Sequence, residues 1–210
     1  MIVTVTQYTD EWYKARLGKF SASDAHVIYT AGKGLDTLCF EKAAELITGE
    51  NKVNYASADM DRGSELESEA RNAYELETGE TVTEVGFVVL DDLPQIGCSP
   101  DGLVGTKGLI EIKCPNDTTY ARYLFDQVID PKYYAQMQMQ MLITETEWCD
   151  YVVYNSNFPK SVTIQRVTLD DEFNKKLYEG MAKAVSTLDK ILEKLNGGQD
   201  KEKTVWIAVD

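Results

Sequence analysis

The stretch GCSPDGLVGTKGLIEIKCP, residues 97–115, decides how this chain folds. Two runs of apolar and β-branched residues flank a Pro-Asp-Gly turn, which predicts two neighbouring strands. Residues two apart in a strand share a face, so Glu111 and Lys113 should project together. Ile110 and Ile112 then lie on the opposite, buried face. The stretch therefore predicts a half-buried strand that carries an acidic and a basic side chain on its other face.

Asp101 falls in the turn before this strand, where we expect its carboxylate to meet that of Glu111. Two convergent carboxylates and a backbone carbonyl, that of Ile112, make an oxygen-rich half-shell suited to Mg²⁺. Lys113 beside them can position a metal-bound water and help to deprotonate it, because the ion lowers the pKa of that water. Asp101, Glu111 and Lys113 are thus predicted to be catalytic in metal-assisted phosphodiester hydrolysis. The alternative is a surface strand with an ion pair, since so short a pattern also arises by chance.

Length and composition narrow the protein class. The 210 residues suit one large domain over residues 1–210, and no linker divides them. The only histidine, His26, argues against serine–histidine catalysis and against zinc sites built on histidine clusters. The 4 cysteines lack CxxC spacing and should be reduced, packed thiols. No apolar run approaches the ~20 residues of a membrane span, and the N-terminus has no signal pattern, so we expect a soluble, cytoplasmic protein without membrane contact.

The net charge of −14 argues against indiscriminate nucleic-acid binding through a basic surface. It leaves open a polyanion held in a groove where divalent ions supply positive charge. Between Glu50 and Asp117, acidic side chains outnumber basic ones three to one. Clustered carboxylates attract hard cations, although a solvated acidic face is the simpler explanation of such a segment.

Caps, glycine stops and hydrophobic periodicity predict both helices and strands. The expected helices cover residues 9–19, 21–34, 35–49, 62–79, 131–145 and 170–195, and the second of them ends in a glycine loop that contains Lys33. The expected strands cover residues 81–90, 95–99, 108–114, 148–155, 161–169 and 203–210. Helices around a central mixed sheet, an α/β (α+β) class, is the predicted architecture.

Four sequence blocks in order give a wider resemblance: WYKARLGKFSAS at 12–23, RGSELESEAR at 62–71, CSPDGLVG with GLIEIKCP at 98–115, and YYAQMQMQ at 133–140. With them the chain resembles the PD-(D/E)XK nuclease superfamily and, within it, the phage lambda exonuclease/YqaJ viral recombinase family. The resemblance covers nearly the whole chain. It implies a restriction-endonuclease-like core.

The resemblance also implies an activity: a Mg²⁺-dependent 5′→3′ exonuclease, with Mn²⁺ as a substitute, acting on linear double-stranded DNA that carries a 5′-phosphate. Such an enzyme releases mononucleotides and leaves a 3′ single-stranded tail for recombination by a single-strand annealing protein. Family members form homotrimer rings around the DNA, so only the lumen need be basic. The implied setting is the cytoplasm of a bacterial host, with a phage or prophage gene.

Matched residue by residue, the resemblance assigns a 5′-phosphate pocket to Arg16, Ser23, Ser99 and Gln136. A guanidinium pairs with phosphate in a bidentate manner, and hydroxyl and amide groups add donors. Ser23 has an alternative role as a helix cap, and Arg16 as a surface residue near a helix C-terminus. Gln138 lies about 200° around the helix from Gln136, so only one of the two can face the site, and we favour Gln136.

Three further residues keep two interpretations each. Glu67 matches an acidic helical position that completes the coordination of a second metal ion, or it is a solvated glutamate. Trp12 stacks near the DNA entrance, or it packs its own helix. Lys33 contacts a DNA backbone from a loop, or it is simply a loop lysine.

Two other functions remain open. A structure-specific or restriction-like endonuclease would keep the core but has no reason to grip a chain end. A non-catalytic DNA-end binding subunit would not need Asp101, Glu111 and Lys113 together.

Overall fold

The computed structural model describes residues 2–50 and 58–196, with the side chains of 4–50 and 66–196. The expected strand at 203–210 lies outside the described residues. The elements are, in order, β1 (Ile2–Val3), α1 (Asp10–Arg16), β2 (Phe20–Ser21), the 3₁₀ turn η1 (Ala22–Asp24), α2 (Ala25–Thr30), α3 (Lys33–Thr48), α4 (Ala58–Thr78), β3 (Val82–Thr83), β4 (Phe87–Leu90), β5 (Leu93–Cys98), β6 (Gly102–Val104), β7 (Gly108–Lys113), α5 (Asp117–Asp126), α6 (Pro131–Thr144), β8 (Trp148–Tyr154), β9 (Val162–Thr168) and α7 (Asp171–Leu195).

The strands form a mixed α/β architecture, as predicted, but they divide between two hydrogen-bonded sheets. One sheet has the order β3-β6-β7-β8-β9 and the other the order β1-β4-β5-β2. The β7–β8 and β2–β5 pairs are parallel and the remaining pairs antiparallel. The chain passes from one sheet to the other between β5 and β6, at residues 99–101. This crossing carries Ser99 and Asp101, two of the predicted site residues.

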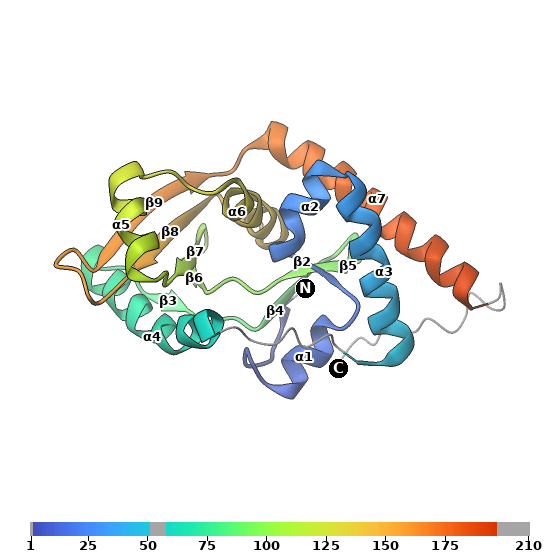
Figure 1. Ribbon diagram of the computed structural model, residues 1–210, viewed down its shortest axis with the longest axis horizontal. Coiled ribbons are helices and arrows are strands. Elements are labelled where there is room, and N and C mark those ends of the chain that lie inside the picture. The colour runs from blue at the N-terminus through green and yellow to red at the C-terminus, as the bar shows by residue number, and fades with distance from the viewer. Residues whose placement is uncertain (1, 51–57, 197–210) are drawn as a thin grey trace.

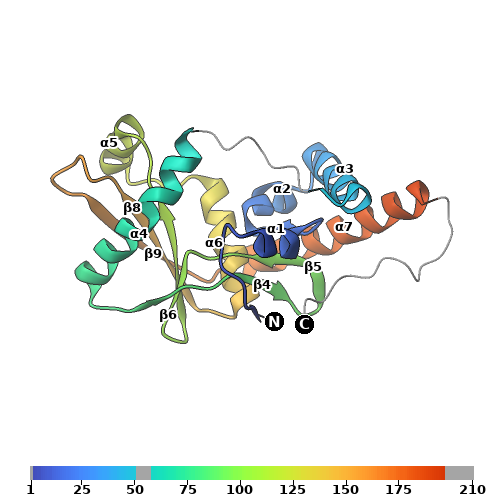
Figure 2. The same ribbon diagram turned by 90° about the horizontal axis from the view of Figure 1, so that it is seen from below.

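Most of the helices lie toward the two ends of these sheets, with α1 and α6 between them (Figures 1 and 2). In both views α2, α3 and α7 lie together at one end, whereas α4 and α5 lie at the other (Figures 1 and 2). Apolar side chains of α2, α3, α6 and α7 form one core with β4 and β5. Gly180 allows α7 to approach α2, because a Cβ there would lie 2.3 Å from the Ile28 carbonyl oxygen. None of the described helices is long and apolar enough to cross a membrane.

Strand β7 is buried on both faces, so the predicted half-buried strand is wrong. It lies between β6 and β8, and Gly108–Ile112 are all buried. Ile110 and Ile112 pack with Tyr74 of α4 in one apolar cluster. On the other face, α6 covers Glu111, which is only 1% exposed. A central strand with a parallel neighbour is usually covered on both sides. Its one glutamate is therefore an enclosed carboxylate.

Candidate active site

The structure brings the three predicted catalytic residues together. Strand β7 directs Glu111 and Lys113 to one face, and the Lys113 Nζ donates to Glu111 Oε1. Gly102 pairs with Ile110 across the β6–β7 ladder, which places Asp101 beside the following residues of β7. Asp101 Oδ2 accepts the backbone N–H of Ile112 at 2.6 Å. The aspartate turn is thus fastened to the strand that carries the other two groups.

Burial and mutual repulsion govern the charges of this cluster. Burial raises the pKa of Asp101 well above its ordinary value, and Glu111 and Glu67 raise it further, against the opposing effect of Lys113. For Lys113, burial by itself lowers the pKa, but the negative charges of Glu111 and Asp101 outweigh it and the net shift is upward. The Lys113 side chain therefore stays protonated and positively charged when no metal ion is bound. It neutralises carboxylates that a divalent ion would also neutralise.

Both oxygens of Glu111 are held by glutamines of α6. Gln136 Nε2 donates to Oε1 and Gln140 Nε2 donates to Oε2, each at 2.7 Å. Gln138 faces away and binds the Thr168 carbonyl at 2.8 Å, so of these two glutamines Gln136 is the one that faces the cluster, and its phosphate role stays a prediction. In this structure Gln136 contacts a carboxylate. Gln140 was missed from the sequence, although it follows Gln136 by four residues and so shares its helix face.

Glu67 on α4 faces the same cluster. Its Oε1 accepts from Arg71 at 2.8 Å and its Oε2 from the Tyr8 hydroxyl at 3.1 Å. Burial raises the pKa of Glu67, with Glu111 adding to the rise and Arg71 and Tyr8 opposing it. The side chain is 15% exposed, which argues against a solvated surface glutamate. Tyr8 was not anticipated, and it takes a left-handed backbone (φ 67°) just before α1.

The donor chemistry of these residues fits a hard divalent cation, because the acidic side chains present oxygen atoms only. Among the described side chains, those of residues 4–50 and 66–196, however, no three His, Cys, Asp or Glu groups converge as a ready metal cluster. Instead, Lys113 and Gln136 bind Glu111, and Arg71 binds Glu67. The predicted metal set of Asp101, Glu111, Glu67 and the Ile112 carbonyl therefore remains a prediction.

A second cluster brings together two predicted phosphate-pocket residues, Arg16 and Ser99, with Trp12, which was predicted near the DNA entrance. Ser99 Oγ accepts from Arg16 NH1 at 3.2 Å and from Trp12 Nε1 at 2.9 Å. The Arg16 guanidinium lies over the Trp12 ring, 4.2 Å from its centroid. Burial lowers the pKa of Arg16, and Asp24 and Cys98 oppose the shift. Trp12 is buried beneath the guanidinium, so it packs its helix and also orients Arg16.

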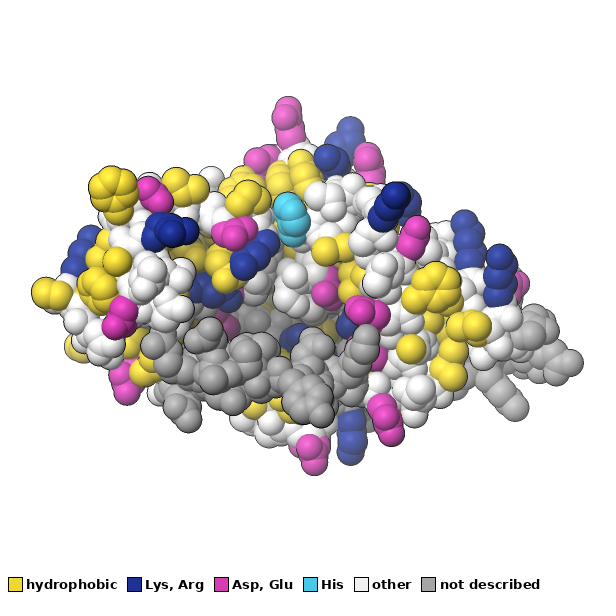
Figure 3. All heavy atoms as spheres, viewed as in Figure 1, with side chains coloured by type: hydrophobic (Ala, Val, Ile, Leu, Met, Phe, Trp, Pro, Cys, Tyr) yellow, Lys and Arg dark blue, Asp and Glu magenta, His cyan; other side chains and the backbone are white. Residues whose placement is uncertain are grey.

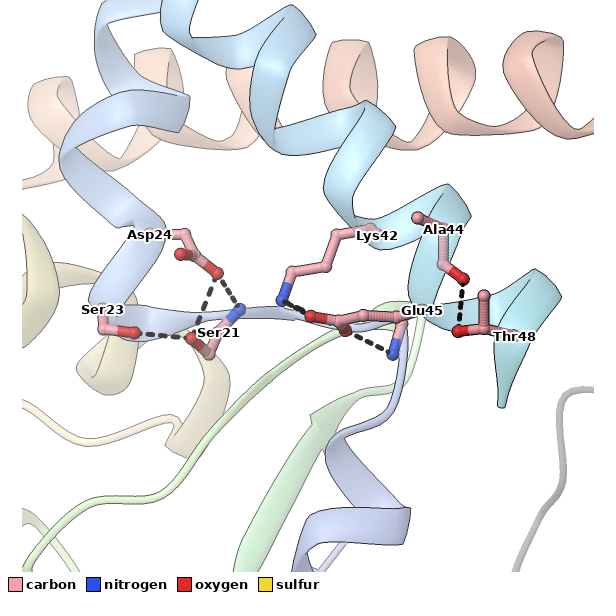
Figure 4. A network of polar contacts seen from close by, with 8 residues as sticks. Ser21, Ser23, Asp24, Lys42, Ala44, Glu45 and Thr48 are labelled. Carbon is pink, nitrogen blue, oxygen red and sulfur yellow. Dashed lines mark hydrogen bonds and ion pairs between the residues drawn. The ribbon is translucent and has the colours of Figure 1, made fainter. Parts of the chain in front are cut away.

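The turn that follows Arg16 is held in place by Glu45 of helix α3, which Figure 4 shows. Glu45 Oε2 accepts the backbone N–H of Gly18 at 3.0 Å. Gly18 has φ +67°, and a Cβ there would lie 2.3 Å from the Leu46 Cγ, so a larger residue would displace the turn. This contact holds the segment that joins Arg16 to β2.

Ser21, rather than Ser23, serves as the helix cap. Ser21 and Asp24 form a capping box at η1. The exposed Ser23 shares a 2.7 Å hydrogen bond with the Ser21 hydroxyl (Figure 4). Ser23 is thus not needed as the cap and remains compatible with its predicted phosphate role.

Lys33 does not lie in a loop, contrary to the prediction. It is the first residue of α3, because α2 ends at Thr30 and Gly32 serves as the next N-cap. The side chain is exposed. Among the contacts of the described residues, none joins Lys33 to either cluster.

Comparisons with known proteins identify relatives of this chain. A model of the YqaJ-like viral recombinase domain matches residues 11–147. The crystal structure of an alkaline exonuclease (LHK-Exo) from Laribacter hongkongensis is 38% identical and superposes with a TM-score of 0.85, covering 90% of this chain and 97% of that one. LHK-Exo in complex with dAMP is 37% identical, with the same coverage and TM-score.

A phage related exonuclease from Haemophilus somnus 129PT is 16% identical, with a TM-score of 0.66 over 84% of this chain and 96% of that one, and supports the fold alone. A search of curated proteins finds no match. The predicted PD-(D/E)XK fold and family are confirmed. The chain belongs to the YqaJ-like viral recombinase family.

Proposed function

We propose that this protein is a Mg²⁺-dependent 5′→3′ exonuclease. It digests one strand of linear double-stranded DNA, releases mononucleotides and leaves a 3′ single-stranded tail. The observation that carries the proposal is the meeting of Asp101, Glu111 and Lys113 in a buried, mutually charged cluster. Groups whose pKa values are strongly perturbed by burial and by neighbouring charge are frequent at catalytic sites.

The position of the Arg16–Ser99 contact favours an exonuclease over an endonuclease. Ser99 precedes Asp101 by two residues, which is at most about 7 Å of chain. A terminal phosphate bound by Arg16 and Ser99 would therefore lie close to the carboxylates. An enzyme that cuts within a strand gains nothing from such a pocket. Ser23 completes the proposed pocket from the neighbouring turn.

Asp101, Glu111 and the Ile112 carbonyl would hold the Mg²⁺ or Mn²⁺ ion, with Glu67 completing the set. A strand residue directs its N–H and C=O to the same side, and the Ile112 N–H already points to Asp101. The ion supplies Lewis acidity and a more acidic bound water. Lys113 would orient the attacking water and balance the negative charge of the carboxylates. Gln136 gives up its bond to Glu111 when ion or substrate enters.

The relatives support the same reaction. LHK-Exo is described as an alkaline exonuclease, and it was solved in complex with dAMP, a nucleoside monophosphate. Mononucleotides are the product that we propose. We also propose, from family resemblance, a homotrimer ring around the DNA and a single-strand annealing protein as partner in the bacterial cytoplasm. A ring would allow a basic lumen in an assembly of chains that each carry a net charge of −14.

The test is a digest of linear duplexes that carry the label at either end, with and without a 5′-phosphate. A covalently closed circle serves as the matched substrate, and chelator replaces Mg²⁺ in parallel. We expect Mg²⁺-dependent release of mononucleotides from linear DNA only, and faster release when the 5′-phosphate is present. Cutting of the circle would favour the endonuclease. DNA-end binding without hydrolysis would favour the non-catalytic subunit.

A further inference from the structure

Gln140 is an enclosed side chain whose amide serves one carboxylate oxygen. It is 0% exposed, and its Nε2 donates to Glu111 Oε2 at 2.7 Å. The other oxygen of Glu111, Oε1, accepts hydrogen bonds from both Lys113 and Gln136. Lys113 is 27% exposed along its side chain, and Gln136 is also only partly buried. The donors on Oε1 can therefore exchange with solvent or ligand, whereas the donor on Oε2 is enclosed.

The orientation of the Gln140 amide follows from its surroundings. The reverse orientation would set the amide oxygen 2.7 Å from a carboxylate oxygen, with no proton between them unless Glu111 were protonated. The amino group must therefore face Glu111. In this orientation Gln140 Oε1 is buried and has no hydrogen-bond partner within the described part of the chain.

An orphaned oxygen is a cost that a methionine or leucine at this position would avoid. Its neighbours on α6, Met139 and Met141, are both fully buried apolar residues. A structural core position in this segment is thus readily filled without a polar group. The feature that distinguishes Gln140 is its hydrogen bond to Glu111.

We propose that Gln140 is a positioning residue for Glu111. By holding Oε2, Gln140 would leave Oε1 as the oxygen of Glu111 that is free to face a divalent ion. The inference rests on the proposed function, because it assigns Glu111 to the metal. Gln136 and Lys113 are the donors that move aside, and Gln140 is the one that stays. Hydrogen-bond partners of metal ligands fix the orientation of those ligands and sustain metal affinity.

The test compares Gln140→Met with Gln138→Met. Both glutamines are 0% exposed on α6, but Gln138 contacts Thr168, Asp170 and Asn174 and does not touch Glu111. Two quantities are measured: the Mg²⁺ concentration that gives half-maximal mononucleotide release, and the Mg²⁺-induced rise in Tm without DNA. We expect Gln140→Met to need about 10- to 100-fold more Mg²⁺ and to lose most of the Tm rise, with an unchanged KM for DNA ends. Gln138→Met should lower the Tm but keep both Mg²⁺ responses.

Equal Mg²⁺ responses in wild type and Gln140→Met would overturn the positioning role, whereas an inactive wild type would overturn the proposed function instead. If Gln140→Met does not fold, the side-chain amides of ¹⁵N-glutamine protein give a second test. We expect the Gln140 amide protons to exchange slowly with and without Mg²⁺, and the Gln136 signals to shift when Mg²⁺ is added. Fast exchange at Gln140, comparable with that of the exposed Gln127, would contradict the proposal.

Discussion

Two buried carboxylates lie on neighbouring strands of the same sheet, and their surroundings differ. Asp150 on β8 is 2% exposed and Glu111 on β7 is 1% exposed. Asp150 lies opposite Ile110 and Glu111 opposite Tyr151, so successive positions turn the two groups to opposite faces. Asp150 meets α4 through the Tyr74 hydroxyl, whereas Glu111 meets α6 through Gln136 and Gln140.

The Asp150 pair is closed. Arg166 donates to both oxygens of Asp150 at 2.8 Å, and Tyr74 adds a third bond at 2.8 Å. The guanidinium also stacks on Trp148, 3.6 Å from the ring centroid. The hydrogen bond to Asp150 raises the pKa of Arg166. The positive charge of Arg166 neutralises the negative charge of Asp150, so the pair carries no excess charge that could bind a ligand.

In the Glu111 cluster, by contrast, the carboxylates outnumber the cations. Glu67 and Asp101 add negative charge beside Glu111; Glu111 helps to raise the pKa of both, and Glu67 also helps to raise the pKa of Asp101. Within the described residues, two cations form ion pairs with these three carboxylates: Lys113 with Glu111, and Arg71 with Glu67. The comparison teaches that a buried ion pair by itself does not mark a site. A functional site is indicated instead by a buried cluster in which carboxylates outnumber the cations that neutralise them.

The largest effect should come from Lys113→Ala. Removing the ammonium takes away the group that orients the attacking water, and we expect mononucleotide release to fall about 10³-fold. Steady-state digestion of a linear duplex at saturating Mg²⁺ measures the loss. As a control, Lys107→Ala removes an exposed lysine that pairs with Glu147 at the surface and should leave the rate unchanged. Near wild-type digestion by Lys113→Ala would contradict a catalytic role for the Glu111 cluster, which would then be a structural ion pair like that of Asp150.

Asp150→Asn should produce the opposite pattern. It leaves Arg166 without its anion, and we expect a loss of about 3 kcal/mol in the free energy of unfolding, at the lower end because Arg166 is half-exposed. Urea titration measures that loss, and the rate at temperatures where the variant is folded should match wild type. A stable but inactive Asp150→Asn protein would contradict the structural role given to Asp150.

Arg16→Ala should act on the substrate end instead of on hydrolysis. Hydrogen bonds to a charged group contribute about 1.5–3 kcal/mol, so the preference for a 5′-phosphate should fall roughly 10- to 100-fold. Competition between phosphorylated and unphosphorylated linear duplexes measures the preference. Lys14→Ala, an exposed basic residue of the same helix, is the control. An undiminished preference in Arg16→Ala would remove the phosphate pocket from this account.

The smallest effect concerns Asp170, a partly buried carboxylate that caps α7. Hydrogen bonds from the backbone N–H of Phe173 and from the Tyr134 hydroxyl lower the pKa of Asp170. A depressed carboxyl pKa stabilises the fold above the ordinary pKa of about 3.9, and the effect disappears as the pH falls through the folded value. Urea unfolding of wild type and Asp170→Asn should therefore differ at pH 6 and converge toward pH 3. A difference that is independent of pH would contradict this assignment.

Much of the site could be predicted from local sequence. The spacing of Glu111 and Lys113 fixes a common face in any strand, and the Pro-Asp-Gly turn places Asp101 nearby. The 200° offset on α6 separates Gln136 from Gln138 in the same way. These relations depend on backbone geometry over a few residues, so the fold preserves them.

Tertiary packing decided the rest. The burial of Glu111 depends on α6 and β8, which lie 20 or more residues further along the chain. Helix α5 was missed because DTTYARYLFD has two threonines and few aliphatic residues to show a helical period. Gln140 resembles core filling in the run MQMQM until its contact with Glu111 is seen. The division into two sheets depends on strand pairing, which no local pattern specifies.

The most direct test of the central claim follows a 5′-label on a linear duplex in Mg²⁺, for wild type and Asp101→Asn. The account predicts that wild type releases the label at once as a mononucleotide and that Asp101→Asn releases almost none while it remains folded. Equal release by the two proteins, or a wild type that degrades the 3′ end first, would contradict it.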